Sequence, residues 1–214
     1  LVPGNHDAYT RKAARQRRFQ QFFANELPEN TPESIFPTIR DVGENVRIIG
    51  LNSAIPTPVL TSYGRVGEEQ RLALEAALKE AREANKFTFV LLHHNLRPRK
   101  KALKDFTSGL RDRDETIQIL WGQRANIVLH GHTHTAHRFS MENETHLLFV
   151  LGCGSSTWME ASHLARYNIY TIENGKLAGI ESRIYRPETE TFQTDTPTLT
   201  WDKNPSWVQE FVAE

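Results

Sequence analysis

The amino-acid sequence predicts a mixed α/β fold in a single domain, residues 1–214. Short runs rich in β-branched and aromatic residues alternate along the chain with stretches that have helical spacing of apolar residues. One of the runs, FTFVLL at residues 87–92, is continuously apolar, which is typical of a strand buried on both faces of a sheet. A chain of 214 residues is long enough to enclose one sizeable core.

The first half of the chain is expected to contain two helices and two strands before that apolar run. The best supported helix spans residues 68–85, where Leu74, Leu78 and Ala81 recur at helical spacing and acidic residues occupy the first turn. The other three elements are the end of a strand at residues 1–2, a helix at 13–25 with its phenylalanines on one side, and a strand at 46–52.

The second half is expected to be richer in strands. Asn174–Gly175 is a strong hairpin signal, and a short helix is expected to start at Asn204–Pro205. This terminal helix carries Trp207 and Phe211 four residues apart and is expected to dock on its own core, with a homodimer contact as the alternative. We expect residues from about 187 to 214 to form an extended tail that ends in this helix. The remaining predictions are a helix at residues 114–121 and strands at 127–129, 146–151, 167–173 and 176–186.

Composition excludes several classes of protein. The 26 acidic and 26 basic residues give zero net charge, so there is no general basic surface for nucleic acid. The longest apolar runs are far too short to span a bilayer. One cysteine, Cys153, excludes an internal disulfide framework and favours a reducing compartment, so a cytoplasmic location is predicted.

Histidines follow three of the predicted strands. His6 lies in PGNHD at the start of the chain, His93 and His94 lie in LLHHN, and LHGHTH contains His132 and His134. Loops beyond the carboxyl ends of parallel strands converge at one edge of an α/β sheet. One such histidine is usually only hydrogen-bonded, and glycine-rich turns can be purely structural, but coincidence at three strand ends favours a metal site.

The donor types narrow the choice of metal. Asn5, next to His6, adds a carboxamide oxygen to the imidazole nitrogens. A mixed nitrogen and oxygen set suits Mn, Fe, Co or Zn better than Ca or Mg.

The ordered motifs resemble those of the calcineurin-like metallophosphoesterases, and among them the bacterial class III cyclic-nucleotide phosphodiesterase type. The matching pieces are GNHD at residues 4–7, the HH pair at 93–94 and GHTH at 131–134, and the resemblance extends to about residue 186. It implies a four-layer αββα sandwich whose N-terminal βαβ portion is absent from this chain.

The resemblance also implies roles for individual residues. Asn5, His93 and His132 would bind one of two divalent metal ions, and His134 would bind the other. His6 would face the leaving group without binding metal, and Asp7 would orient His6 through a hydrogen bond.

The chain departs from the family pattern in two places. Asn95 follows the HH pair where Pro is common. The family's D-x-H and G-D-x-x-D motifs, which supply further metal ligands upstream of GNHD, do not occur in the 214 residues. We therefore expect the chain to be the C-terminal larger part of such a domain, cut just before GNHD, and nearly inactive by itself.

For the intact domain the resemblance implies hydrolysis of a small phosphoester by a hydroxide that two metal ions activate, with a phosphodiester such as a cyclic nucleotide as substrate. The alternatives are a phosphomonoesterase, a nucleotide–lipid pyrophosphatase, or a non-catalytic interaction module that keeps remnants of the site.

Two alternative roles are predicted for each of the residues around the histidines. His94 would either contact the substrate or pack behind the ligands. Basic residues follow two of the motifs and would either attract an anionic substrate, with Arg97 as a binding residue, or form solvated surface. They are Arg11, Lys12, Arg15, Arg17 and Arg18 after GNHD, and Arg97, Arg99, Lys100, Lys101 and Lys104 after HHN.

Overall fold

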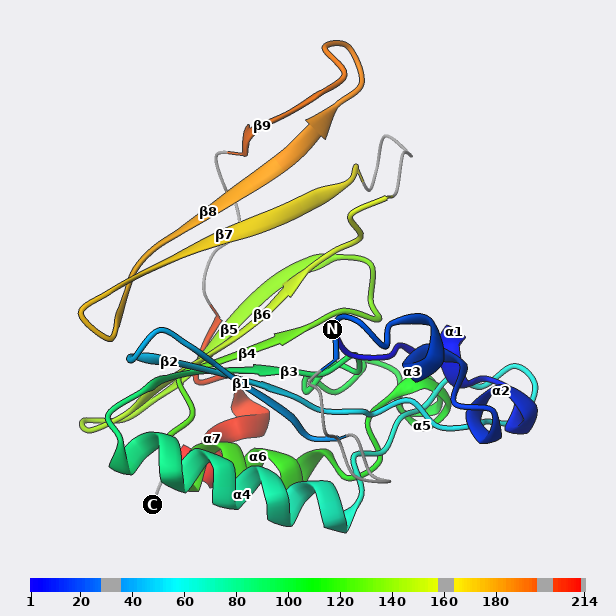
Figure 1. Cartoon of the computed structure of the whole chain (residues 1–214), viewed down its shortest axis with the longest axis horizontal. Coiled ribbons are helices and arrows are strands. Elements are labelled where there is room, and N and C mark those ends of the chain that lie inside the picture. The colour runs from blue at the N-terminus through cyan, green and yellow to red at the C-terminus, as the bar shows by residue number, and fades with distance from the viewer. Residues whose placement is uncertain (28–35, 158–163, 196–201, 213–214) are drawn as a thin grey trace.

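Two β-sheets and a set of helices make up the computed structural model, which describes residues 1–27, 36–157, 164–195 and 202–212 (Figure 1). The seven-stranded sheet has the order β1-β2-β3-β4-β6-β5-β10, and the smaller sheet has the order β7-β8-β9. The large sheet consists of β1 (Thr38–Val42), β2 (Val46–Gly50), β3 (Phe87–Leu91), β4 (Ile127–His130), β6 (Leu147–Cys153), β5 (Ala136–Glu142) and β10 (Asp202–Lys203). The small sheet consists of β7 (Arg166–Glu173), β8 (Lys176–Arg186) and β9 (Thr191–Asp195).

Four neighbouring strands of the large sheet, β2, β3, β4 and β6, run parallel. Their carboxyl ends therefore lie at the same edge, which we call the carboxyl edge. The strands β1 and β5 run antiparallel to their neighbours on either side of this group. Loops that follow β2, β3 and β4 leave the sheet at the carboxyl edge, so residues far apart in sequence meet there.

The central strands β3 and β4 of the large sheet are apolar on both faces, as the continuous run at residues 87–92 predicts for β3. Val90 and Val128 belong to the core on the helix side, whereas Phe89 and Ile127 belong to the core on the opposite side. This alternation follows from the two-residue period of a strand. Helices α4 (Glu68–Glu83), α6 (Arg113–Gly122) and α7 (Gln209–Val212) cover the first face (Figure 1).

The small sheet packs on the second face. Tyr170 of β7 contacts Phe89 of β3 edge to face, with ring centroids 5.7 Å apart. The β7–β8 turn is the predicted hairpin, because Asn174 and Gly175 both have positive φ, 52° and 70°, as a type I′ turn requires. Helices, large sheet and small sheet are successive layers, so the α/β class is confirmed and the described residues form three layers of the expected sandwich.

Helix α4 forms where the spacing of apolar residues predicts it. Leu74, Leu78 and Ala81 are buried against the large sheet, and Glu68 and Glu69 lie in the first turn, where they interact favourably with the helix dipole. The C-terminal segment also docks on this core, as expected. Helix η1 (Ser206–Val208) leads into α7, and Phe211 is buried.

Several elements differ from the prediction. The expected helix at residues 13–25 is two short helices, α2 (Arg11–Arg15) and α3 (Arg18–Phe22), because Arg17 takes the left-handed conformation with φ 48°. Residues 1–2 are not part of a strand. Strands β1, β5, β9 and β10 and helices α1 (Asn5–Ala8) and α5 (Ala102–Ser108) were not expected from the sequence.

Within the described ranges, no helix combines the length and apolar character that crossing a bilayer requires.

Candidate metal centre

Three segments meet at the carboxyl edge of the large sheet. The turns that follow β3 and β4 stay paired beyond the strands, because the Gly131 N–H donates a 3.1 Å hydrogen bond to the His93 carbonyl. Helix α1, at the start of the chain, lies at the same edge (Figure 1). A β-carbon on Gly4 would lie 3.0 Å from the His93 ring, so glycine lets the chain start approach this turn closely.

Asn5, His93 and His132 come together in this corner although they are up to 127 positions apart in sequence. His93 Nε2 lies 2.8 Å from Asn5 Oδ1 and 3.2 Å from His132 Nδ1. The third side of the triangle, from His132 Nδ1 to Asn5 Oδ1, is 3.4 Å. We call these three residues the Asn5–His93–His132 cluster.

A second contact orients the His132 ring. Its Nε2–H donates a 3.0 Å hydrogen bond to the carbonyl of Ser108, at the end of α5. The proton is therefore on Nε2, and the lone pair of Nδ1 faces Asn5 and His93. Hydrogen bonding of the far nitrogen to a carbonyl is the usual arrangement for a metal-binding histidine.

The backbone of the GHTH turn is strained at both of its histidines. His132 has φ 64° and His134 has φ 57°, in the left-handed region that residues other than glycine rarely occupy. Such conformations cost roughly 1–3 kcal/mol each and cluster at functional sites.

The imidazoles of the cluster are neutral at physiological pH. Burial, reinforced by the charges of His132, His134 and His6, lowers the pKa of His93 to about 3. Burial, followed by the charge of Arg99, lowers the pKa of His132 to about 4. Neutral imidazole is the form that binds a metal ion.

The cluster has the dimensions of part of a metal coordination shell. Ligands about 2.0–2.2 Å from a common ion are about 3.0–3.4 Å from each other, close to the three distances here. The donor set of two imidazoles and one amide oxygen suits Mn, Fe, Co or Zn. In the described residues, no group of three or more His, Cys, Asp or Glu side chains is placed to hold an ion, so the cluster supplies neutral ligands only.

His134 and His6 lie near the cluster, and both are exposed. Their charges reach the rings of His93 and His132, whose pKa values they lower. The His6 ring packs edge to face on Tyr9, with centroids 4.8 Å apart.

Asp7 differs from its expected contact. Its Oδ2 accepts a 2.8 Å hydrogen bond from the Gly4 N–H, so the carboxylate closes the one-turn helix that presents His6. Asp7 thus positions the turn, and within the described residues its carboxylate forms no hydrogen bond with the His6 ring.

His94 is fully buried, and both of its ring nitrogens are engaged. Ser53 Oγ donates to His94 Nδ1 over 2.8 Å, and His94 Nε2–H donates to the Ser62 carbonyl over 3.0 Å. Gly64 leaves room for the ring, since a β-carbon there would lie 2.2 Å from Nδ1. Of the two expectations for His94, this geometry favours the packed residue.

Arg97, the predicted substrate-binding arginine, is paired with an acidic residue outside the cluster. Arg97 Nη2 forms a 3.1 Å ion pair with Asp202 of β10. Besides burial, the charge of Arg99 lowers the pKa of both His94 and His132, whereas the charge of Arg97 lowers the pKa of His137. The sequence placed both arginines in one basic run and could not distinguish them.

A second pair of histidines lies behind the GHTH turn. His130 and His137 flank Gly152 on adjacent strands, and both rings are largely buried. The sequence predicts no role for either histidine. Their positions on the two sides of GHTH are the signal that could have indicated a role at the site.

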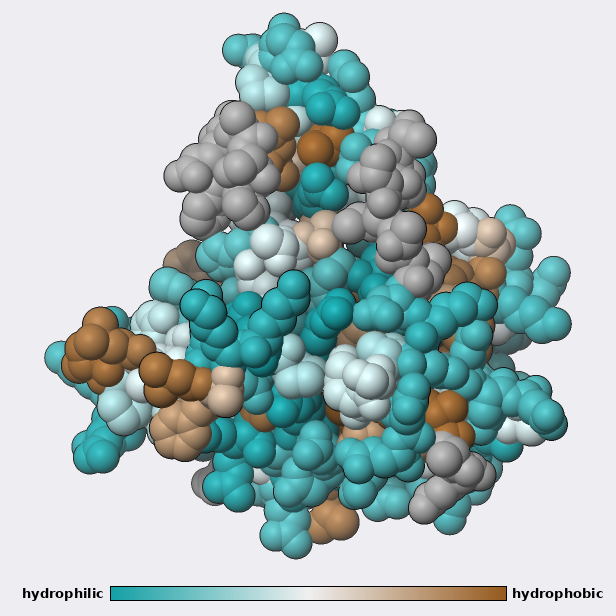
Figure 2. All heavy atoms as spheres, turned by 180° about the vertical axis from the view of Figure 1, so that it is seen from behind, coloured by the Kyte–Doolittle hydropathy of each residue, from teal (hydrophilic) through white to brown (hydrophobic). Residues whose placement is uncertain are grey.

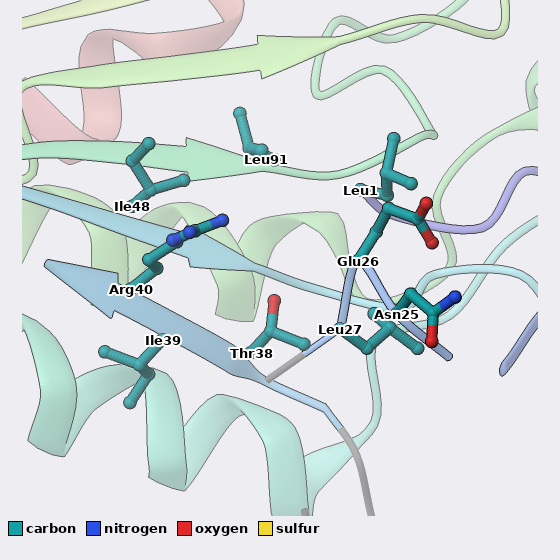
Figure 3. Close-up of a pocket in the computed structure, with 9 residues that line it drawn as sticks. All are labelled: Leu1, Asn25, Glu26, Leu27, Thr38, Ile39, Arg40, Ile48 and Leu91. Carbon is teal, nitrogen blue, oxygen red and sulfur yellow. The ribbon is translucent and has the colours of Figure 1, made fainter. Parts of the chain in front are cut away.

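A separate cavity of about 450 Å³ opens beside the start of the chain (Figure 3). None of its lining residues is a predicted site residue. They are Leu1, Asn25, Glu26, Leu27, Thr38, Ile39, Arg40, Ile48 and Leu91.

Comparison with known proteins gives one matching family model and several similar solved structures. The family model for calcineurin-like phosphoesterases matches residues 1–136. A dimetal phosphatase from Danio rerio is similar at 10% identity and a TM-score of 0.45, over 69% of this chain and 53% of that one. GAP50, the anchor in the inner membrane complex of Plasmodium, is similar at 11% identity and a TM-score of 0.38, over 82% of this chain and 58% of that one. The chain thus spans little more than half of either protein. No curated protein sequence matches it.

Proposed function

The chain belongs to the calcineurin-like phosphoesterase family, and on that premise we propose that its Asn5–His93–His132 cluster binds a divalent metal ion for the hydrolysis of a phosphoester. The observation that carries the proposal is the triangle of donor atoms, 2.8, 3.2 and 3.4 Å on its sides. The neutral state of both imidazoles and the fixed Nε2 tautomer of His132 support it.

The side chains at the site have different proposed roles. Asn5 Oδ1, His93 Nε2 and His132 Nδ1 would hold one ion of Mn, Fe, Zn or Co, and His134 would bind a second ion nearby. When bound, such a pair of ions lowers the pKa of a water molecule and neutralises phosphate charge. Ser108 holds His132 through its carbonyl, and His94 fills the space behind the cluster.

His6 is the group we propose for proton transfer. Its ring is exposed beside the cluster, and it would donate a proton from an imidazole nitrogen to the leaving oxygen. Asp7 contributes by closing the turn that carries His6. Arg99, whose charge reaches His132, would attract the phosphoester anion.

The finer assignments are also proposals. We propose a phosphodiester substrate, in line with the resemblance to class III cyclic-nucleotide phosphodiesterases. A phosphomonoester, a nucleotide–lipid pyrophosphate and a non-catalytic role are the alternatives. A single domain over residues 1–214, a cytoplasmic location and a homodimer stay predictions.

Metal binding by defined variants tests the proposal. Isothermal titration with Mn²⁺ or Co²⁺ should show binding that His132→Ala removes. His146→Ala is the matched control, since His146 is a partly buried histidine remote from the cluster, beside Trp121. Equal binding by the two variants would contradict the assigned site.

A further inference from the structure

The loop between β2 and α4 displays two adjacent aliphatic side chains to solvent. Val59 and Leu60 are 89% and 97% exposed. The loop tip is a closed turn, because the Pro58 carbonyl accepts hydrogen bonds from both the N–H and the hydroxyl of Thr61, at 3.1 and 2.7 Å. The two side chains are therefore held outward by a hydrogen-bonded turn.

Helix α5 extends this apolar surface. Leu103 and Phe106, one turn apart on α5, are 75% and 62% exposed. The loop and α5 lie side by side, since the Ser62 N–H donates a 2.8 Å hydrogen bond to the Thr107 carbonyl. We call Val59, Leu60, Leu103 and Phe106 the apolar tip. Figure 2 shows hydrophobic side chains gathered and projecting at one edge of the molecule.

Basic residues flank the apolar tip on two sides. On one side is α2. The two residues just before it, Tyr9 and Thr10, line a hollow of about 450 Å³ together with residues 57–62 of the β2–α4 loop. On the other side is α5 with the run before it. The basic residues concerned are Arg11, Lys12 and Arg15 of α2 and Lys100, Lys101 and Lys104 of the α5 segment.

These basic side chains are available to bind an anion from outside the chain. All six are exposed, and none has an ion pair with a carboxylate in the part of the chain that the structure describes. The acidic residue of α5, Asp105, is already paired with Arg113. The net charge of this surface is therefore positive although that of the chain is zero.

The same surface adjoins the Asn5–His93–His132 cluster. Ser108, at the end of α5, accepts the hydrogen bond of His132, and Asn5 Nδ2 donates a 2.7 Å hydrogen bond to the Tyr9 hydroxyl. The segments that carry the apolar tip and the basic residues thus also hold the site.

We propose that this surface docks on an anionic lipid bilayer, with the apolar tip inserted between headgroups and the basic residues on lipid phosphates. Aliphatic and aromatic side chains beside Lys and Arg are the composition that binds such an interface. A nucleic acid would use the basic residues but gains nothing from Val59 and Leu60. On the proposed function, docking would bring the site to phosphoesters carried by lipids.

Vesicle sedimentation tests the docking without metal or substrate. The chain should bind vesicles made of equal parts phosphatidylcholine and phosphatidylglycerol, and it should bind pure phosphatidylcholine far less. The double variant Val59→Ser with Leu60→Ser should lower the partition coefficient by more than about tenfold. Leu72→Ser, on an exposed leucine of α4, is the matched control and should bind as the wild type does.

A charge series completes the test. Lys100→Gln, Lys101→Gln and Lys104→Gln together should lower the partition coefficient about 100-fold. Lys79→Gln, on an exposed residue of α4, should leave it unchanged. His132→Ala should also bind vesicles normally, so loss of the metal site and loss of docking are separate results.

Three outcomes would overturn the proposal. One is equal binding to anionic and neutral vesicles. Another is normal vesicle binding by the Val59 and Leu60 double variant, which would mean nonspecific adsorption by charge alone. The third is absence of vesicle binding together with a dimer that the double variant dissociates, which would make a second copy the occupant of the apolar tip.

Discussion

The imidazoles of His130 and His137 lie one at each end of the GHTH turn, with their centroids 4.6 Å apart. His130 Nδ1–H donates to the Gly131 carbonyl and His137 Nδ1–H donates to the Thr135 carbonyl, each over 3.3 Å. The turn that presents His132 and His134 is therefore held at both ends. Groups that hydrogen-bond metal ligands directly typically contribute 10–100-fold to metal affinity, and this pair would act on His132 and His134 through the backbone of the turn.

Gly152 should be essential to that arrangement. A β-carbon on Gly152 would lie 2.8 Å from both imidazoles, so Gly152→Ala must displace at least one ring. We expect Gly152→Ala to weaken Co²⁺ binding by about 10–100-fold in isothermal titration. Gly179→Ala is the matched control, because nothing lies within 4 Å of a β-carbon there. Unchanged affinity in Gly152→Ala would show that the pair does not position the turn.

Two substitutions separate the contribution of the His137 hydrogen bond from that of its ring volume. In His137→Asn the side-chain amide keeps an N–H close to the position of Nδ1, whereas His137→Leu fills space without a donor. Co²⁺ affinity should be largely kept in the first variant and should fall in the second. If the Co²⁺ affinity falls equally in the two variants, the imidazole ring of His137, and not its N–H, positions the turn.

Metal content should distinguish His6 from the ligands. His6→Ala should leave the Mn²⁺ stoichiometry of the chain unchanged, since we assign His6 to proton transfer, whereas His93→Ala should lose the ion. Equilibrium dialysis against Mn²⁺, followed by inductively coupled plasma mass spectrometry, measures both. Loss of metal from His6→Ala would make His6 a ligand.

The neutral donor set of the cluster limits what this chain does alone. Because no carboxylate of the described residues joins Asn5, His93 and His132, the charge of two adjacent ions would not be neutralised. We expect weak binding of about one ion per chain and almost no hydrolysis of bis(p-nitrophenyl) phosphate. Full Mn²⁺-dependent turnover by these 214 residues would refute this expectation.

A histidine outside the site should make stability depend on pH. Burial, followed by the charge of Arg124, lowers the pKa of His146 from 6.5 to about 4. Between these values the unfolded chain binds more protons than the folded one, so stability present above about pH 6.5 is lost as the pH falls toward 4. In urea titrations, His146→Gln should therefore lose less unfolding free energy than the wild type between about pH 7 and about pH 5. Parallel losses would mean that His146 is not perturbed.

The sequence predicted the helices and strands that carry strong periodicity or continuous apolar runs. Helix α4 and strand β3 are such cases. Strand β1, TIRDV, was missed because four of its five residues are exposed and give no apolar signal. The break in the helix at residues 13–25 was missed because Arg17 adopts the left-handed conformation without glycine or proline to mark it.

For the site, the motifs predicted which residues converge but not their contacts. His93 and His132 come together because they lie in turns at the ends of neighbouring parallel strands, whereas Asn5 reaches them from the start of helix α1. The choice of Nδ1 on His132 depends on the Ser108 carbonyl, 24 positions away, and so requires the fold. The same is true of His94, whose ring nitrogens are both occupied by groups from the loop after β2.

Anomalous X-ray scattering at the cobalt absorption edge, from crystals of the chain grown with Co²⁺, tests the central claim most directly. The account predicts one strong peak about 2.0–2.2 Å from each of Asn5 Oδ1, His93 Nε2 and His132 Nδ1. A peak only at other histidines, such as His130 and His137, with the three donor atoms of the cluster still in direct contact, would contradict it.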